Sequence, residues 1–303
     1  MFKSTPTVPQ ESVAFSVLVR TLLIHLRLHF QLLLAPIFLW GYLLTGRPLT
    51  LPFWFAFFAF HLFLYGGTTA FNSYYDQDEG PVGGLEKPPV ALPALLPFSL
   101  ICQAIGAVVA ALVNLPFLLI YLAIFLMGTA YSHPRFRWKG RPLGGLLTVA
   151  IGQGLLAGLG GWVSAYPQWV PPNALAWLGI VAVALITTGF YPITQIYQVD
   201  EDLARGDLTF AAWAGPRGTF AFAISTLGLA ALLLIWVMAQ ELGAWQALIV
   251  ALCYIGLLVA IIRWSLSYDA TQVIANFRRV MRIYTLTSSG FLLFLALHLL
   301  LTR

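Results

Sequence analysis

Carboxylates in this 303-residue chain gather in two short stretches. The first acidic cluster consists of Asp76, Asp78, Glu79 and Glu86. The second acidic cluster consists of Asp200, Glu201, Asp202 and Asp207. Together they hold eight of the eleven acidic residues, more than the solubility of loop ends requires. Because carboxylate and amide oxygens suit Mg²⁺, which is often shared with substrate phosphates, we interpret the clusters as two walls of one site.

Apolar segments surround both clusters. With 60% hydrophobic and 9% charged residues, the chain has too little polar surface to cover a water-soluble globule. We therefore expect an all-α integral membrane protein, a single transmembrane domain over residues 1–303, with helices around a central cavity. Since a span needs about 20 apolar residues, the sequence divides into about nine of them. Their expected limits are 17–45, 52–75, 92–113, 116–132, 143–164, 174–198, 217–238, 244–263 and 281–301.

Two of these segments carry polar residues at helical spacing and end in the acidic clusters. The second segment carries His61, Tyr65, Thr68, Asn72 and Asp76. The sixth carries Thr188, Tyr191, Gln195, Gln198 and Asp202. Polar groups in lipid are costly unless they face protein or water, so each stripe is expected to line an interior cavity. The alternative is hydrogen bonding between helices.

Cations give the orientation and a possible anion site. Lys and Arg concentrate in the connections on one side of the membrane, which include those that carry the acidic clusters. This places both clusters on the cytoplasmic side of the cytoplasmic membrane. The net charge of +5 is thus topological, and we expect no nucleic-acid partner. Arg27 lies deep in the first segment and is expected to face the cavity. The connection after the fourth segment carries Arg135, Arg137, Lys139 and Arg141. Cations of this kind neutralise phosphate, and the apolar cavity suits a lipid chain, so an isoprenoid diphosphate fits both ends.

With these segments and motifs, the chain resembles the UbiA superfamily of intramembrane prenyltransferases. That family has nine helices, an N-x-x-x-D element after the second and a D-x-x-x-D element after the sixth. Asn72 and Asp76 match the first element, and the spacing of Asp202, Gly206 and Thr209 is similar to the second. The loop from Tyr131 to Lys139 resembles the one after the fourth helix in homogentisate-type members.

The resemblance implies a mechanism and a set of site residues. An allylic diphosphate ionises, Mg²⁺ stabilises the leaving group, and aromatic faces hold the cation. The metal ligands that the resemblance implies are Asn72, Asp76, Glu79, Gln198 and Asp202. The diphosphate cations are Arg27, Arg137, Lys139, Arg141 and Arg205. The expected catalytic residues are Asp76, Asp202, Tyr65 and Tyr191. Three positions depart from the family pattern, because Ser73, Gly80 and Gln198 replace acidic residues, and Asp78, Glu79 and Asp200 are candidates to compensate.

The sequence leaves the reaction open in two respects. It selects no acceptor, isoprenoid chain length or oligomeric state, so the expected partners are an isoprenoid diphosphate, an unknown acceptor and membrane lipid. A membrane terpene cyclase is a second interpretation, in which the cation attacks a double bond of the same molecule. A transporter of lipid or another substrate is a third, although a transporter is expected to bind near the midplane, whereas both acidic clusters lie at one face.

Overall fold

The computed structural model describes residues 15–302, in which helices are joined by loops and the one β-type pairing is a short bridge between Val82 and Leu85. The first third contains α1 (Phe15–His25), α2 (Leu28–Leu32), α3 (Ala35–Leu43), α4 (Leu51–Phe58), the π-helix η1 (Ala59–Tyr65), α5 (Gly66–Asp76) and α6 (Leu95–Ala111). The middle contains α7 (Leu115–Ser132), the 3₁₀ turn η2 (Trp138–Gly140), α8 (Pro142–Thr148), the π-helix η3 (Val149–Leu156) and α9 (Ala157–Val163). The last part contains α10 (Ala174–Gln195), α11 (Val199–Ala204), α12 (Phe210–Glu241), α13 (Ala244–Leu266) and α14 (Val273–Thr302).

The structure confirms a multi-pass helical membrane protein. Within residues 15–302, seven helices are long and apolar enough to cross a membrane, and the bent pair Phe15–Leu32 and Ala35–Leu43 makes an eighth. The remaining expected segment corresponds to α6, which is apolar but only 17 residues long. The expected count of about nine thus agrees with the helices found.

Four expected spans differ in detail, and one of them, the ninth, begins at Val273 and not at 281. The first is broken, because Arg27 has a left-handed backbone (φ 49°) between α1 and α2. The sixth ends at Gln195, so Gln198 and Asp202 do not continue the stripe on the same helix, and Asp202 lies on the separate α11. The seventh begins earlier than expected, at Phe210, and changes direction at Gly215, whose φ is 65°. Glycine tolerates that backbone conformation without a steric penalty.

Helix ends follow from local sequence. Asn114 and Asn173 cap α7 and α10, each accepting a hydrogen bond from a backbone N–H three residues on, at 2.7 and 2.8 Å. Such caps satisfy donors that have no partner within the helix. Proline stands in the first two positions of α4, α7 and α8, where a missing N–H costs nothing.

Glycines allow the central helices to pack closely. A side chain at Gly41 of α3 would overlap the carbonyl of Gly158 in α9, and one at Gly161 would overlap the carbonyl of Phe38. Small residues at such crossings let backbones approach each other inside a membrane. Next to this crossing, the rings of Phe38, Phe60 and Phe117 form a buried aromatic core.

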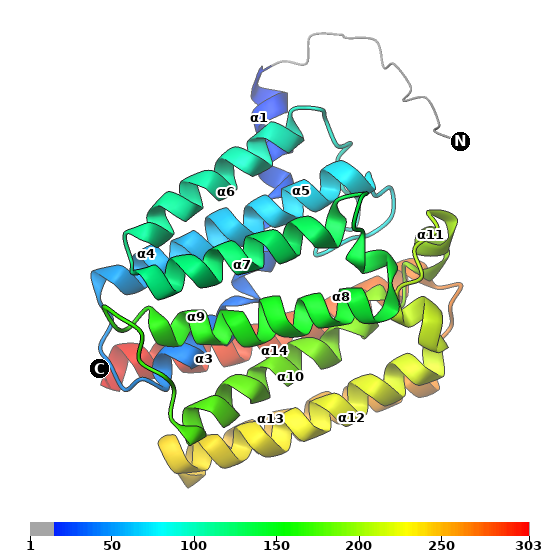
Figure 1. The fold of residues 1–303 in the computed structure, drawn as a ribbon. Coiled ribbons are helices and arrows are strands. Elements are labelled where there is room, and N and C mark those ends of the chain that lie inside the picture. Colours follow the sequence, from blue (N-terminus) through cyan, green and yellow to red (C-terminus); the bar gives the residue numbers. More distant parts are fainter. Residues whose placement is uncertain (1–14, 303) are drawn as a thin grey trace.

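The connections that carry charge lie at one end of the bundle. In Figure 1 the loop after α5, the turn between α7 and α8, and α11 are grouped at the same end, while the C-terminus lies at the other. This arrangement brings the two acidic clusters together, as the sequence predicts.

Candidate functional site

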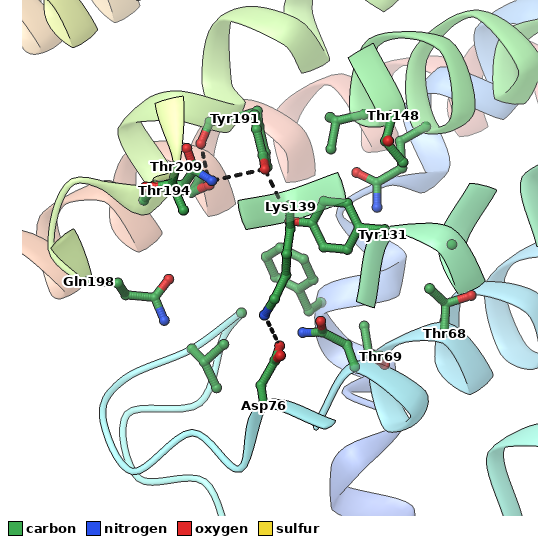
Figure 2. Close-up of a pocket in the computed structure, with 18 of the residues that line it drawn as sticks. Thr68, Thr69, Asp76, Tyr131, Lys139, Thr148, Tyr191, Thr194, Gln198 and Thr209 are labelled. Carbon is green, nitrogen blue, oxygen red and sulfur yellow. Dashed lines mark hydrogen bonds and ion pairs between the residues drawn. The ribbon is translucent and has the colours of Figure 1, made fainter. Parts of the chain in front are cut away.

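A cavity of about 220 Å³ opens at this charged end. Its wall includes Tyr65, Thr68, Asn72 and Asp76 from the η1–α5 segment. On the other side it includes Tyr191, Gln195, Gln198 and Asp202 from α10, α11 and the residues between them. Two polar stripes more than a hundred residues apart in sequence therefore face one space, and Figure 2 shows Asp76 and Gln198 on its walls with Lys139 between the helices.

Lys139 and Arg137 both contact Asp76 of the first acidic cluster. Figure 2 shows the Lys139 ammonium reaching the carboxylate of Asp76, whose side chain is almost fully buried. Arg137 Nη1 lies 3.5 Å from the same carboxylate, and its Nε and Nη2 each donate to Asp207 at 2.7 Å. Arg137 adopts a left-handed backbone (φ 40°), a conformation that costs about 1 kcal/mol or more and is common at functional sites.

Arg205 joins the two clusters. Its guanidinium lies 2.6 Å from Asp78 of the first cluster, and 3.0 Å from Asp202 and 3.4 Å from Glu201 of the second. Burial is the largest single effect and lowers the pKa of Arg205, but the hydrogen bond to Asp78 and the charges of the neighbouring carboxylates together outweigh it and raise that pKa. Burial raises the pKa of Asp202 to about 6, although Arg205 acts in the opposite direction. The arginine is therefore a counter-ion shared by both walls.

Two amide side chains, Asn72 and Gln198, also line the cavity. Asn72 Oδ1 accepts a hydrogen bond from Ser132 at 2.7 Å, and Gln198 Nε2 donates to the Pro81 carbonyl at 2.9 Å, which leaves the Gln198 oxygen available. Nearby, Gln195 donates to the Tyr191 hydroxyl at 2.8 Å, and that hydroxyl lies 3.1 Å from the hydroxyl of Tyr131.

This donor set supplies part of a Mg²⁺ coordination shell, which a substrate would complete. Within residues 15–302, no group of three or more His, Cys, Asp or Glu side chains is arranged to hold a metal ion alone. Mg²⁺ usually takes one or two protein carboxylates and completes its shell with water and substrate phosphates. Asp76 and Asp202, with the amide oxygens of Asn72 and Gln198, match that requirement in chemical type.

Several expected residues lie elsewhere. Glu79 is exposed, and only its backbone N–H contacts the second cluster, at 3.4 Å from Glu201. Arg141 is exposed and lies beside a separate hollow near Trp138. His61 is buried beside Phe57, whose carbonyl it contacts at 2.9 Å, so the stripe turns to the cavity only from Tyr65 onward. The roles proposed for Glu79 and Arg141 stay predictions.

Sequence reasoning missed some residues of the site. Tyr131 and Thr209 line the cavity, and Asp207 is the bidentate partner of Arg137. Asp207 belongs to the second acidic cluster. The sequence therefore indicates a carboxylate at this position, but it does not indicate which cation pairs with it. That pairing depends on the backbone of the turn at residues 133–141.

Fold and cavity together define the class: a multi-pass helical membrane protein with a charged cavity at one end of its bundle. A model of the UbiA prenyltransferase family matches residues 34–286, so the chain belongs to that family. Family membership and fold thus identify an enzyme of the prenyltransferase class.

Individual relatives agree with this assignment. The chain is 28% identical over 176 residues to a digeranylgeranylglyceryl phosphate synthase of Methanothrix thermoacetophila, a match covering 57% of this chain and 62% of that protein. The match therefore spans less than two thirds of the relative. A UbiA homologue from Archaeoglobus fulgidus, solved bound to GPP and Mg²⁺, superimposes with a TM-score of 0.63 at 18% identity, covering 90% of this chain and 99% of that one. A homologue from Aeropyrum pernix K1 gives 0.64 at 24% identity, with 88% and 97% coverage. At these identities the structural likeness shows the fold.

Proposed function

We propose that the protein is a Mg²⁺-dependent prenyltransferase that moves an isoprenoid chain from a polyprenyl diphosphate to a small or lipophilic acceptor. The observation that carries this proposal is the meeting of both acidic clusters, through Arg205, at the mouth of one membrane-embedded cavity. Two relatives support it, since one is named for a prenyl transfer product and another was solved with a prenyl diphosphate and Mg²⁺.

We assign metal binding and diphosphate binding to different groups of residues at the cavity. Asp76, Asp202, Asn72 and Gln198 would hold the metal ion. When bound, Mg²⁺ supplies positive charge for the oxygen that leaves with the diphosphate. Lys139, Arg137 and Arg205 are placed to exchange a carboxylate partner for phosphate oxygens, because each already makes charged contacts in or beside the cavity. Exposed Arg141 and Glu79 would act from the rim.

The apolar part of the lining is suited to the isoprenoid. Ile124, Met127 and Met281 line the same cavity as the charged residues, and so do Tyr65 and Tyr191. The allylic C–O bond breaks and its electron pair leaves with the diphosphate. The resulting carbocation is attracted to aromatic faces. An acceptor atom then forms the new bond and loses its proton.

The orientation of the protein in the membrane is also part of this proposal. Because Lys and Arg are concentrated in the connections at the cavity end, we place this end on the cytoplasmic side of the cytoplasmic membrane.

A direct experiment tests the proposed site. Asp76→Ala and Asp202→Ala are expected to abolish Mg²⁺-dependent release of diphosphate from isoprenoid diphosphates in detergent. The control is Asp269→Ala, which removes an exposed carboxylate outside both acidic clusters and outside the cavity wall. A double variant of Asp76 and Asp202 with full activity would refute the site.

The cyclase interpretation rests on the departures at Ser73, Gly80 and Gln198. Incubation with geranylgeranyl diphosphate alone separates the two reactions, because only a cyclase makes a new hydrocarbon without acceptor. Metal-dependent turnover in detergent, with no membrane gradient, would also count against a transporter.

A further inference from the structure

Gln153 is a polar residue of the cavity wall to which the proposed site gives no role. It lies in the π-helix η3, inside the membrane-spanning segment Pro142–Val163. π-helical segments are rare and frequently occur at functional sites. The side chain of Gln153 lines the cavity and makes no hydrogen bond with the described residues. Because an amide at membrane depth is costly without a partner, its partner is expected to come from the cavity.

Tyr65 gives a second observation at a similar depth. It ends η1, the other π-helix among the described residues. Only 4% of the residue is exposed, and its hydroxyl has no hydrogen-bond partner although it lines the cavity. Tyr65 precedes Asp76 by the length of α5, which has 11 residues, and Gln153 lies equally far after Pro142, the first residue of α8. Each is thus about three helical turns from the charged end.

Helix α7 completes this part of the cavity. A side chain at Gly128 of α7 would lie 3.0 Å from Thr68 of α5, and one at Gly152 of η3 would lie 3.8 Å from Met127 of α7. All four residues line the cavity. The helices α5, α7 and η3 are therefore neighbours around the space that Gln153 faces, and two glycines keep their wall free of side chains.

The donor supplies no partner for this amide. Its diphosphate is proposed to bind at the charged end, where Arg27 is among the cations that line the cavity. An isoprenoid chain has no hydrogen-bonding group, and an apolar path for it lies on another side. There Phe30 and Met281 line the cavity, and Phe30 stacks on Tyr284 with ring centroids 5.7 Å apart. Tyr284 lines a neighbouring apolar cavity of about 420 Å³ between α10, α13 and α14. The space beside Gln153 is thus left for a second ligand.

We propose that Gln153 is a specificity-determining residue for the acceptor, whose uncharged hydroxyl or carbonyl group it hydrogen-bonds between α5, α7 and η3. This inference rests on the proposed function and specifies how the second substrate is recognised. A glutamine amide both donates and accepts, as does the hydroxyl of Tyr65, so this part of the cavity suits either group. A molecule without such a group leaves the amide unpaired and is selected against.

The test compares probes that differ in one polar group. One set consists of 1-naphthol, 1-tetralone and naphthalene, which share a bicyclic frame. The other consists of an alkylglycerol and the alkane that matches its chain. Binding of each is measured to detergent-purified protein loaded with Mg²⁺ and geranylgeranyl thiolodiphosphate, a donor analogue that resists ionisation. Each probe is compared between variants, so its partition into detergent cancels.

Two variants change the amide, and a third is the control. Gln153→Met keeps the approximate shape of the side chain without its amide, and Gln153→Asn keeps the amide on a shorter side chain. Gln246→Met in α13 is the matched control, because Gln246 is also partly buried but lies outside the cavity wall.

At least one hydroxyl or carbonyl probe is expected to bind the wild-type protein. Gln153→Met should weaken that binding about three- to tenfold, as expected for the loss of one neutral hydrogen bond. The matching hydrocarbon should bind Gln153→Met as tightly as wild type or more tightly, because the unpaired amide is gone. Gln153→Asn should lie between the two, and Gln246→Met should match wild type. The donor analogue should bind all variants within about twofold of wild type, because its charge is met at the charged end.

Three results would overturn the inference. They are the failure of every hydroxyl and carbonyl probe to bind the loaded wild-type protein, an equal loss of polar and hydrocarbon probes in Gln153→Met, as a purely structural role predicts, and a loss of donor affinity instead of probe affinity. If Gln153→Met does not fold, Gln153→Asn decides the matter by the same comparison. Failure of the donor analogue to bind in the presence of Mg²⁺ would instead refute the proposed function itself.

Discussion

Lys139 and Asp76 are ion-paired inside the cavity, and this contact joins the turn after α7 to the last residue of α5. Lys139 is thus ion-paired with a carboxylate that we propose as a metal ligand. Substrate binding must exchange these partners: the phosphate takes the ammonium, and the metal takes the carboxylate.

Replacement of Lys139 separates its effect on prenyl diphosphate binding from its effect on Mg²⁺ binding. In Lys139→Met, affinity for a prenyl diphosphate should fall about tenfold, because a charged hydrogen-bond donor to phosphate is lost. Affinity for Mg²⁺ without substrate should stay the same or rise, because the competing ammonium is gone. Titration calorimetry with each ligand measures both quantities. Lys87→Met, an exposed lysine in a loop at the same end, is the control and should change neither. A parallel fall in both affinities would contradict the exchange.

The ring of Tyr191 can be tested apart from its hydroxyl. If its face stabilises the allylic cation, Tyr191→Phe should keep most of the turnover rate. Tyr191→Leu should lose about ten- to thirtyfold, as expected for a cation–π contact of up to about 2 kcal/mol in a desolvated site. Rates at saturating donor and acceptor give the answer. Equal losses in both variants would assign the role to the hydroxyl, which Gln195 and Tyr131 contact.

The pKa of Asp202 predicts a pH dependence. Burial raises it from 3.8 to about 6 in the folded protein, so the carboxylate is protonated below that pH and cannot hold a metal. Mg²⁺ affinity without substrate should therefore rise with pH through about 6 and then level off. Asp202→Asn should remove this rise, and an unchanged profile in that variant would exclude Asp202 as its source.

The same shift has a consequence of opposite sign for stability. The folded state holds the Asp202 proton more tightly than the unfolded state, so its contribution to the unfolding free energy of the metal-free protein is largest below pH 3.8 and declines up to about pH 6. Chemical denaturation at several pH values, compared with Asp202→Asn, measures that part of the pH dependence.

The close crossing of α3 and α9 depends on glycines, which have no side chain. Gly41→Ala should destabilise the protein by about 1–3 kcal/mol or more, because the new methyl group overlaps the Gly158 carbonyl and the helices must separate. Gly228→Ala in α12 meets nothing within 4 Å and should be neutral or stabilising, by up to about 1 kcal/mol. Thermal unfolding in detergent compares the two. Equal stability would show that the crossing relaxes without cost.

Sequence alone determined the class of this protein and the end at which its chemistry is expected. Charge is so scarce that apolar segments of membrane-spanning length are unmistakable, and a run of side chains at helical spacing fixes which residues share a helix face. The sequence therefore predicts that Asn72 and Asp76 lie on one wall and the second acidic cluster on the opposite wall. The family match over residues 34–286 agrees with the class of protein that the sequence indicates.

Only the tertiary structure decided which charges meet. The break at Arg27, the end of α10 before Gln198, and the pairing of Arg137 with Asp207 depend on backbone turns where helical periodicity no longer applies. In a cavity of low dielectric, the choice between two carboxylates is made by ångström differences in position, which hydrophobic patterns do not contain. For the same reason, the lack of a hydrogen-bond partner for Gln153 among the described residues becomes visible only once the helices are packed around it.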